Sequence, residues 1–414
     1  MTDKFESVCV LGLGYIGLPT AATLAAAGLA VKGVDIRTDV VDALNAGDAH
    51  FSEPDLELLV RGAVESGKLK AYTKPQPADA FIITVPTPMN GDKSPDMSFV
   101  DAAMRSLMPV LAPGNLVLLE STSPLGTTAS IAGIVREERP DLVDGDALKI
   151  SLAYCPERIL PGQMVRELVE NDRIVGGLMP EDAARARDLY KTFVHGEVHQ
   201  TDAITAEMVK LIENAYRDVN IAFANEVAAI GETHGIDPWE AISLANRHPR
   251  VNILSPGPGV GGHCIAVDPW FLITQNPGLA GLMNAARSVN DGRPETIVGK
   301  IEAAAEAAGS KRIACLGLAY KPNVDDLRES PALEIVRELA QRGYDVSAVE
   351  PHVDALPSKL AEAGSVTLRS LDDAFGASDV VALLVAHTPF ADVTAGMLGG
   401  KAVVDAVGLW RRQG

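Results

Sequence analysis

This chain carries the glycine motif Gly12-Leu13-Gly14-Tyr15-Ile16-Gly17. An apolar run over residues 7–11 comes directly before it, and an Ala- and Leu-rich run follows it to about residue 27. A second apolar segment, over residues 29–34, closes on Asp35. The alternative interpretation is a glycine-rich turn that holds no ligand. A G-x-G-x-x-G motif predicts a dinucleotide site when the surrounding elements follow the order strand, glycine turn, helix, strand and acid, as they do here.

The residues of this motif have separate expected roles. Gly12 makes the turn, Gly14 admits the pyrophosphate, and Gly17 lets helix and strand pack closely. The helix N-terminus offers backbone N–H groups to the phosphates. Asp35 would accept a hydrogen bond from the ribose 2′-hydroxyl and repel a 2′-phosphate, although Arg37 nearby could attract one. The sequence therefore predicts NAD, rather than NADP, as the cofactor.

Further apolar runs, over residues 81–85, 116–119 and 150–154, extend the expected sheet. Ligands of a doubly wound sheet bind beyond the carboxyl ends of its strands. Each threonine there could equally cap a turn, and Glu157, after the third run, could be an ordinary ion-paired carboxylate. With these residues included, the expected cofactor contacts are Gly12, Gly14, Tyr15, Ile16, Gly17, Asp35, Arg37, Thr87, Thr122 and Thr128.

The bulk composition bounds the class of protein. A length of 414 residues suggests two or three domains. The net charge of −19 argues against nucleic acid or an anionic membrane surface as the main partner. No signal peptide or bilayer-spanning run is visible. The four cysteines (Cys9, Cys155, Cys264 and Cys315) are far apart and form no C-x-x-C pair. We therefore expect a cytoplasmic protein without a metal site or a disulfide framework.

The middle of the chain predicts one long helix over residues 201–234, which lack proline. Lys210, Asn214 and Arg217 are spaced by four and three, so they lie on a common face. A lysine and an asparagine one turn apart can hold a hydroxyl group between a cation and an amide; a solvated polar face is the alternative. A second helical stretch, over residues 238–247, follows, and together they suggest a connecting and dimerising segment. Apolar residues at helical spacing are Met208, Leu211, Ala215, Val219, Phe223, Val227 and Ile230.

A glycine-rich loop over residues 257–262 leads to Cys264 and, four residues later, Asp268. Glycines let a ligand approach the backbone closely, so the cysteine would be within reach of a substrate. The alternative is a buried cysteine that serves only as a small apolar side chain. The basic residues His248 and Arg250, just before this loop, suit a phosphate but could also belong to an ordinary surface.

The last third of the chain repeats the strand–helix alternation without the three glycines. Strands are expected over residues 311–316, 345–349, 380–385 and 402–405, with helices over 295–308 and from about Pro331. Such a fold can bind a different nucleotide, whose phosphates Lys321 and Arg328 could meet. The expected fold class is α/β, with two Rossmann-like doubly wound domains joined by a central helical domain with one long helix. The expected domain limits are 1–200, 201–300 and 301–414.

The whole chain resembles the UDP-glucose/GDP-mannose dehydrogenase family. Many UDP-glucose enzymes of that family carry Cys-Phe-Pro-Lys-Asp in the cysteine loop, where this chain has Ile265, Ala266 and Val267 between Cys264 and Asp268. This departure resembles the branch that acts on UDP-N-acetylhexosamines. The resemblance rests on residues 12–19 (GLGYIGLP), 85–88 (VPTP), 120–124 (ESTSP), 154–158 (YCPER), 210–214 (KLIEN), 257–268 (GPGVGGHCIAVD) and 317–331 (GLAYKPNVDDLRESP).

The resemblance implies a four-electron oxidation of the sugar C6 alcohol to a carboxylate by two NAD, for surface polysaccharide biosynthesis. UDP-N-acetyl-D-mannosamine is the implied substrate, with UDP-GlcNAc and UDP-glucose as alternatives. The implied catalytic residues are Cys264 as nucleophile, Lys210 or an Asp268-held water as first base, Asn214 beside the alkoxide, and Glu157 as the base for hydrolysis. The implied UDP-sugar contacts are Arg158, Ile159, Lys210, Asn214, Arg217, His248, Arg250, Gly261, Tyr320, Lys321 and Arg328.

Two rival interpretations stay open at this point. A two-electron hydroxyacid dehydrogenase also pairs a Rossmann domain with a Lys-x-x-x-Asn helix, but it needs neither a loop cysteine nor a second nucleotide fold. A non-catalytic NAD sensor needs no nucleophile. The coincidence of Lys210, Cys264 and Asp268 suggests a nucleophile and therefore argues against a sensor. The expected partners are a UDP-sugar and further copies of the chain, as a homodimer or higher homo-oligomer through the central helix.

Overall fold

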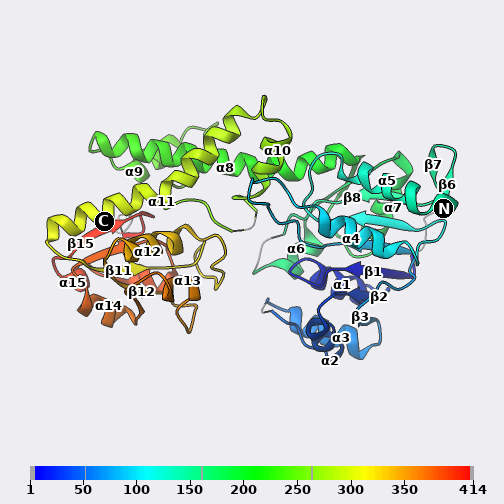
Figure 1. Ribbon diagram of the computed structural model, residues 1–414, viewed down its shortest axis with the longest axis horizontal. Helices are drawn as coiled ribbons and strands as arrows, with labels where there is room; N and C mark the ends of the chain where they lie inside the picture. The colour runs from blue at the N-terminus through cyan, green and yellow to red at the C-terminus, as the bar shows by residue number, and fades with distance from the viewer. Residues whose placement is uncertain (1–4, 52, 160–161, 263, 411–414) are drawn as a thin grey trace. The chain divides into compact units, whose positions relative to one another are not determined.

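The structure is a computed structural model that describes residues 5–51, 53–159, 162–262 and 264–410 (Figure 1). It divides into two compact units. Unit 1 consists of residues 1–212 and 270–275, and unit 2 consists of residues 213–269 and 276–414. Two helices, α8 (Ala203–Thr233) and α10 (Asp268–Gln275), therefore belong partly to each unit.

Unit 1 is built on a sheet whose strands pair in parallel except for β8 with β9. Its central strands are continuous apolar runs because both faces of the sheet are covered. Successive side chains alternate between the two faces, so Val8 and Val10 lie in one core and Cys9 and Leu11 in the other. In spatial order the strands are β10 (Val198–Asp202), β9 (Arg173–Gly177), β8 (Ser151–Tyr154), β5 (Leu116–Leu119), β4 (Ala80–Ile83), β1 (Ser7–Leu11), β2 (Ala30–Val34) and β3 (Leu69–Tyr72).

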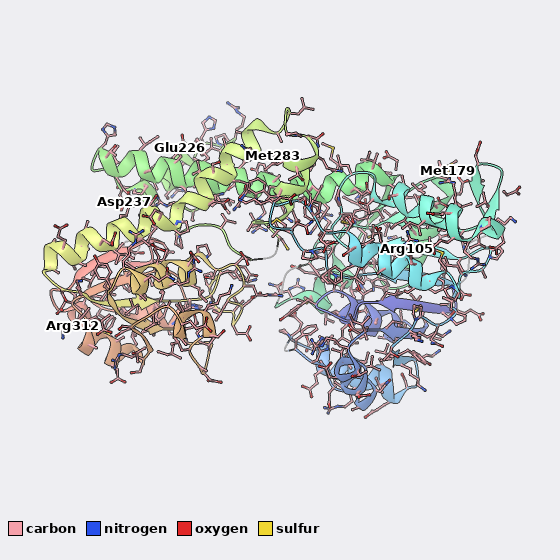
Figure 2. All side chains as sticks on the ribbon, viewed as in Figure 1. Arg105, Met179, Glu226, Asp237, Met283 and Arg312 are labelled. Carbon is pink, nitrogen blue, oxygen red and sulfur yellow. The ribbon has the colours of Figure 1, made fainter. Side chains whose placement is uncertain are left out.

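The helices of unit 1 cover the two faces of this sheet. Residues of α1, α3 and α7 fill the core that holds Val8, and residues of α4 and α5 fill the core that holds Cys9. On the second face, Arg105 of α4, which is labelled in Figure 2, lies near the end of α5. It forms an ion pair with Glu138 of that helix. The helices are α1 (Gly17–Ala26), α2 (Thr38–Ala46), α3 (Leu56–Glu65), α4 (Ser98–Leu107), α5 (Thr127–Glu138), α6 (Met164–Glu170) and α7 (Pro180–Tyr190), with η1 (Pro140–Leu142) and the hairpin β6 (Val143–Asp144) and β7 (Ala147–Leu148) between α5 and β8.

Unit 2 contains a second, all-parallel sheet with the same alternation. Ile313 and Cys315 face the core under α11 and α12, whereas Ala314 and Leu316 face the core under α14. The strands in spatial order are β13 (Val366–Leu368), β12 (Asp345–Val349), β11 (Arg312–Leu316), β14 (Val380–Leu383) and β15 (Ala402–Asp405). The helices are α9 (Pro238–Ala245), α11 (Gly281–Ala308), α12 (Pro331–Gln341), α13 (Ser358–Ala361), α14 (Leu371–Ala377), η2 (Thr388–Asp392) and α15 (Ala395–Leu398).

Helix α11 begins at Gly281, well before the expected start at Glu295, and contains Pro294 in its interior. A proline removes one backbone hydrogen bond and costs about 3 kcal/mol or more inside a helix, so sequence rules place a helix start there. Buried contacts before the proline, made by Arg287, Asn290 and Arg293, hold the earlier turns in place.

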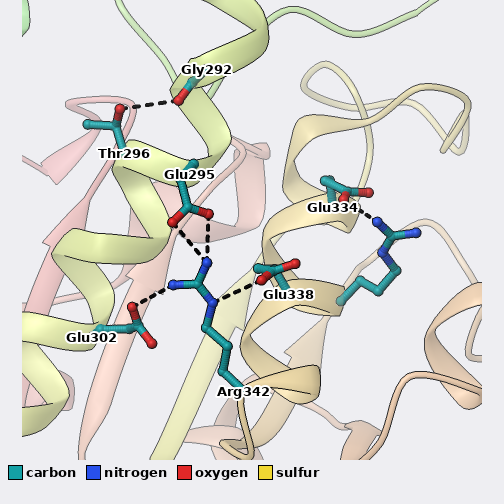
Figure 3. A network of polar contacts seen from close by, with 8 residues as sticks. Gly292, Glu295, Thr296, Glu302, Glu334, Glu338 and Arg342 are labelled. Carbon is teal, nitrogen blue, oxygen red and sulfur yellow. Dashed lines mark hydrogen bonds and ion pairs between the residues drawn. The ribbon is translucent and has the colours of Figure 1, made fainter.

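The surface of α11 is tied to α12 by one arginine. Arg342 binds Glu295 and Glu302 of α11 and Glu338 of α12 (Figure 3). Its side chain is 30% exposed, so water weakens each ion pair. In the described part of the chain, no helix is both long and apolar enough to cross a membrane.

Candidate active site

The turn after β1 has the geometry that a dinucleotide needs. Gly12 adopts φ +89°, and its N–H donates to the carbonyl of Val34 at 2.8 Å. A Cβ on Gly17 would lie 1.7 Å from the Gly12 carbonyl oxygen, so only glycine fits there. A Cβ on Gly14 would meet nothing within 4 Å. The turn thus leaves open space beside Gly14, where a pyrophosphate can approach the backbone, and it fits the group that the motif predicts.

The acid after β2 faces this turn. Asp35 accepts hydrogen bonds from the N–H of Leu13 at 3.0 Å and from the N–H of Arg37 at 2.9 Å. The Arg37 guanidinium binds Asp39 instead, and this hydrogen bond lowers the pKa of the Asp39 carboxyl. Tyr15 is 43% exposed, and its ring centroid lies 4.5 Å from that of Phe51. A negative charge, not a positive one, therefore stands beside the expected ribose position.

The threonines expected at the crevice have different surroundings. Thr87 and Thr122 are half-buried, beyond β4 and β5. Thr128 is buried, and its hydroxyl donates to Glu207 of α8 at 2.7 Å. The same carboxylate accepts from the N–H of Thr128 at 2.8 Å and of Gly126 at 2.6 Å. Glu207 thus caps the N-terminus of α5. The sequence around Glu207 does not predict this role.

Lys210 and Glu157 form a largely buried pair in unit 1. The Lys210 Nζ donates to the Glu157 carbonyl at 2.8 Å and to Glu157 Oε2 at 3.1 Å. Their side chains are 5% and 13% exposed. Glu157 Oε1 accepts from the N–H of Ile159 at 2.5 Å, which fixes the carboxylate beyond β8. The structure therefore brings together a cation and a carboxylate that the sequence assigned to two separate steps.

Asn214, Asp268 and Cys264 come together in unit 2. Asn214 Nδ2 donates to Asp268 Oδ2 at 2.6 Å, and both side chains are buried. The Asp268 N–H donates to the Cys264 carbonyl at 2.8 Å, so the start of α10 fixes the turn after the cysteine. The residue before Cys264 lies outside the described residues.

The four cysteines have two kinds of environment. Burial raises the pKa of the Cys9 thiol to about 11, and that of the Cys155 and Cys315 thiols to about 12. These three are buried, whereas Cys264 is exposed. A buried thiol with a raised pKa is chemically inert, because the thiolate is the nucleophile. Cys264 is thus the cysteine that a substrate can reach.

The glycine loop before Cys264 packs against the segment 317–330. A Cβ on Gly261 would lie 2.4 Å from the Glu329 carbonyl oxygen, and one on Gly262 would lie 2.8 Å from the Tyr320 ring. The Gly262 N–H donates to the Arg328 carbonyl at 3.3 Å. These glycines are required because two loops of unit 2 approach each other closely.

The other expected substrate residues are more scattered. Arg158 is half-buried and donates to the Asp172 carbonyl at 3.3 Å, and Ile159 is buried beside α6. Lys321 is half-buried, and its ammonium lies 5.8 Å from the Tyr320 ring centroid. Three more are exposed on unit 2: Arg217, His248 and Arg250. Among the described residues, no polar contact joins these three to the cysteine loop.

Helix α8 has a buried polar face that the sequence prediction found only in part. Lys210 and Asn214 were expected on it, whereas Arg217 is exposed. The residues missed are Glu207, Asp218 and Asn225, which are 0%, 0% and 1% exposed. Positions 207, 210, 214, 218 and 225 follow the helical period, so a polar periodicity was present in the sequence beside the apolar one.

The glycine turn of unit 1 fits a dinucleotide, and unit 2 repeats the same alternation of strand and helix. This layout is that of a dinucleotide-dependent dehydrogenase with two Rossmann-like folds. Comparison with known proteins gives the family. The sequence matches the UDP-glucose/GDP-mannose dehydrogenase family through its NAD binding domain (residues 6–194), its central domain (204–292) and its UDP binding domain (314–412). The chain therefore belongs to this family, and NAD is its cofactor.

Relatives and solved structures agree with this assignment. The chain is 52% identical to UDP-N-acetyl-D-mannosamine dehydrogenase of Yersinia pestis, over 99% of this chain and 100% of the relative. It is 51% identical to NDP-N-acetyl-D-galactosaminuronic acid dehydrogenase of Ralstonia nicotianae, over 98% and 96%. The structure of UDP-D-ManNAc dehydrogenase from Pyrococcus horikoshii matches with a TM-score of 0.89 at 38% identity, over 97% and 96%. The expected family, fold class and cofactor are confirmed.

Proposed function

We propose that this chain oxidises the C6 alcohol of UDP-N-acetyl-D-mannosamine to the carboxylate in two NAD-dependent steps, for surface polysaccharide biosynthesis. The names of relatives at 52% identity over the full chain support the substrate. The match to a UDP binding domain supports the nucleotide. The observation that carries the four-electron chemistry is the exposed thiol of Cys264, since a two-electron alcohol dehydrogenase needs no nucleophile.

The first oxidation needs a base at the C6 hydroxyl. Lys210 in its neutral form, or a water held by Asp268, removes the hydroxyl proton. The Lys210 ammonium and the Asn214 amide then stabilise the developing alkoxide. Glu157 holds the Lys210 Nζ through its carbonyl and its carboxylate, which orients the base. NAD, which the glycine turn and Asp35 would hold, would supply the hydride acceptor for both oxidations at C6.

The second oxidation requires the aldehyde to become a hydride donor. The Cys264 thiolate adds to the aldehyde carbon, and the carbonyl electron pair moves to oxygen, which takes a proton and gives a thiohemiacetal. Departure of the second hydride from that carbon, with loss of the hydroxyl proton, gives a thioester. Water, deprotonated by Glu157, adds to the thioester, the C–S bond breaks, and the carboxylate and the Cys264 thiolate are released.

Two of the proposed catalytic residues lie on α8. Helix α8 runs through the boundary between the units and carries Lys210 and Asn214. These two are four residues apart, so they lie on one face of that helix. We propose that this face carries the C6 hydroxyl, and that the domain limits lie near residues 200 and 300.

The proposed UDP-sugar contacts keep the set implied by the family resemblance. Tyr320 and Arg328 support it best, because the loop that carries them contacts Gly261 and Gly262 before Cys264. The NAD contacts are proposed at the glycine turn, Asp35 and the threonines beyond β4 and β5.

A substrate panel tests the proposed function. UDP-N-acetyl-D-mannosamine should give the highest kcat/KM and two NADH per sugar, compared with UDP-GlcNAc, UDP-GalNAc and UDP-glucose. The 51% identical relative named for a galactosaminuronic acid favours UDP-GalNAc as the second candidate. Equal or better turnover of UDP-GlcNAc, UDP-GalNAc or UDP-glucose would refute the mannosamine assignment, and one NADH per sugar would refute the four-electron reaction.

We also propose that the chain forms a homodimer or a larger homo-oligomer through α8. Tyr216, Phe223 and Ile230 are spaced by seven along this helix and are 63%, 54% and 55% exposed. Large apolar side chains that repeat on one helix face indicate a protein interface. Light scattering should give at least twice the chain mass for the wild type and a smaller mass for Phe223→Glu. A wild type that is monomeric at micromolar concentration contradicts this proposal.

A further inference from the structure

The turn after β11 repeats the turn after β1. Gly317 adopts φ +94°, and its N–H donates to the Val349 carbonyl at 2.8 Å. Gly12 and Val34 form the equivalent bond at 2.8 Å in unit 1. The following helix differs, because α1 begins five residues after Gly12 whereas α12 begins fourteen residues after Gly317. Unit 2 therefore has a longer segment, residues 317–330, between the turn and its helix; we call it the substrate loop.

The acid at the end of the second strand also differs between the units. Asp35 accepts one N–H from its turn, that of Leu13. Glu350, at the equivalent place after β12, accepts two, from Leu318 at 2.7 Å and Ala319 at 3.0 Å. Glu350 is 5% exposed, and its carboxylate lies against the turn. The carboxylate that would contact a ribose in a dinucleotide fold thus binds the backbone of its own turn in unit 2.

His387 also contacts the Glu350 carboxylate. Its ring is fully buried, and its Nε2 lies 3.0 Å from Glu350 Oε2. Its Nδ1 accepts from the N–H of Asn323, in the substrate loop, at 2.9 Å. Since Nδ1 accepts, Nε2 is the ring nitrogen that donates to Glu350. Asn323 adopts φ +60°, and its side-chain oxygen accepts from the N–H of Thr388 at 2.9 Å, so the residue is held from both sides.

This cluster has the composition of a metal site but a different bonding pattern. The ligand atoms of Glu350, His352 and His387 lie within 4.8 Å of one another. A ligating histidine needs a free lone pair on one ring nitrogen. Both nitrogens of His387 are engaged by protein groups, so the geometry points to a hydrogen-bonded clamp instead.

The clamp fixes a loop that reaches the cysteine. Tyr320 and Arg328, two proposed UDP-sugar contacts, lie within the substrate loop, and the Tyr320 N–H donates to the Asp326 carbonyl at 3.1 Å. Gly262, two residues before Cys264, binds the Arg328 carbonyl and packs on the Tyr320 ring. A shift of the substrate loop would therefore move both the nucleotide contacts and the backbone before Cys264.

We propose that Glu350 and His387 are positioning residues for the nucleotide sugar: they hold the substrate loop in the arrangement that presents Tyr320, Lys321 and Arg328 to the uridine diphosphate. This inference rests on the proposed function. Preorganised groups bind more tightly because less conformational entropy is lost on binding, so the clamp acts on nucleotide affinity without touching the ligand. Glu350 and His387 lie in unit 2, whereas the glycine turn proposed for NAD lies in unit 1.

The test uses the full-length protein with His387→Phe, which keeps an aromatic ring beside Phe390 and removes both hydrogen bonds. Glu350→Gln, of nearly the same shape, removes the charge and serves if His387→Phe does not fold. We expect the Kd of UDP, measured by calorimetry, and the KM of the nucleotide sugar to rise at least tenfold, while the Kd of NAD changes less than twofold.

Two variants control for stability and for the local ring contact. His352→Ala removes an exposed ring whose centroid lies 4.9 Å from that of His387 but leaves its hydrogen bonds intact, and it should bind UDP as the wild type does. Arg342→Gln weakens unit 2 away from the substrate loop and should lower Tm without changing the Kd of UDP. A folded His387→Phe or Glu350→Gln protein that binds UDP within twofold of the wild type overturns the proposal. Because UDP binding is measured without turnover, this result stays separate from a failure of the proposed sugar substrate.

Discussion

The role of Glu207 as a cap from another helix predicts a measurable cost for Glu207→Gln. The carboxylate accepts three hydrogen bonds, from the Gly126 N–H, the Thr128 N–H and the Thr128 hydroxyl. An amide has one oxygen, so its NH₂ must face one of the two backbone donors. A buried donor left without an acceptor costs about 1–3 kcal/mol. Burial raises the pKa of Glu207, so neutralising the residue recovers part of its desolvation cost, and we expect a loss of about 1–2 kcal/mol.

The assay is thermal unfolding together with NAD binding. A loss of 1 kcal/mol shifts Tm by about 2–4 °C in a domain of 150–250 residues, so Tm should fall by about 2–8 °C. Because Gly126 and Thr128 begin α5 beside the proposed cofactor crevice, the Kd of NAD should also rise about threefold to tenfold, which corresponds to about 0.7–1.4 kcal/mol. Glu226→Gln, an exposed glutamate on the same helix, is the control. A Glu207→Gln protein whose Tm lies within about 1 °C of wild type, with unchanged NAD affinity, would refute this reasoning.

Three further predictions follow from single side chains. The Asp35 carboxylate should repel a 2′-phosphate, so kcat/KM with NAD should exceed that with NADP at least about tenfold, and Asp35→Asn should narrow the ratio; equal values for the wild type would contradict the assignment. Arg328→Ala should raise the KM of the UDP-sugar while NAD affinity holds, and equal weakening of both ligands would mean that unit 2 does not bind the nucleotide. Burial raises the pKa of Glu350, but the hydrogen bonds from His387 and the turn leave it below its ordinary value of 4.5. The stabilising contribution of the Glu350 carboxylate is therefore complete above pH 4.5 and is lost as pH falls through the lower, folded-state pKa. Below pH 4.5 the free energy of unfolding of the wild type should fall more steeply than that of Glu350→Gln. Parallel curves for the two proteins would rule out this contribution.

Local sequence was sufficient where a few neighbouring residues determine the backbone. The turn at Gly12 needs positive φ and a close helix approach at Gly17, and both requirements are visible as glycines between apolar runs. The long helix expected over residues 201–234 is α8 (Ala203–Thr233), because its period is unbroken by proline. The same reasoning failed at α11, where tertiary contacts of Arg287 and Asn290 outweigh the cost of Pro294.

The parts of the site that the sequence did not reveal depend on distant pairs. His387 is 37 residues from Glu350 and 64 residues from Asn323 in the sequence, yet it forms hydrogen bonds with both. No local pattern predicts which turn a histidine will bind. Glu207 caps a helix that begins about 80 residues earlier in the chain, at Thr127. Cys264 was found because glycines precede it, and the strand positions of Cys9 and Cys315 indicated core packing, but the exposure of Cys264 and the burial of Cys155 needed the fold.

The most direct test of the account is the NADH stoichiometry of Cys264→Ser. Serine keeps the size of the side chain and removes the thiolate, and a hydroxyl adds poorly to the aldehyde. With Lys210 and the NAD site intact, the variant should form at most about one NADH per site quickly and release aldehyde or stall as an ester. The wild type should form two NADH per sugar and the carboxylate, identified by mass spectrometry. A folded Cys264→Ser protein that makes the carboxylate near the wild-type rate, with two NADH per sugar, would contradict the mechanism.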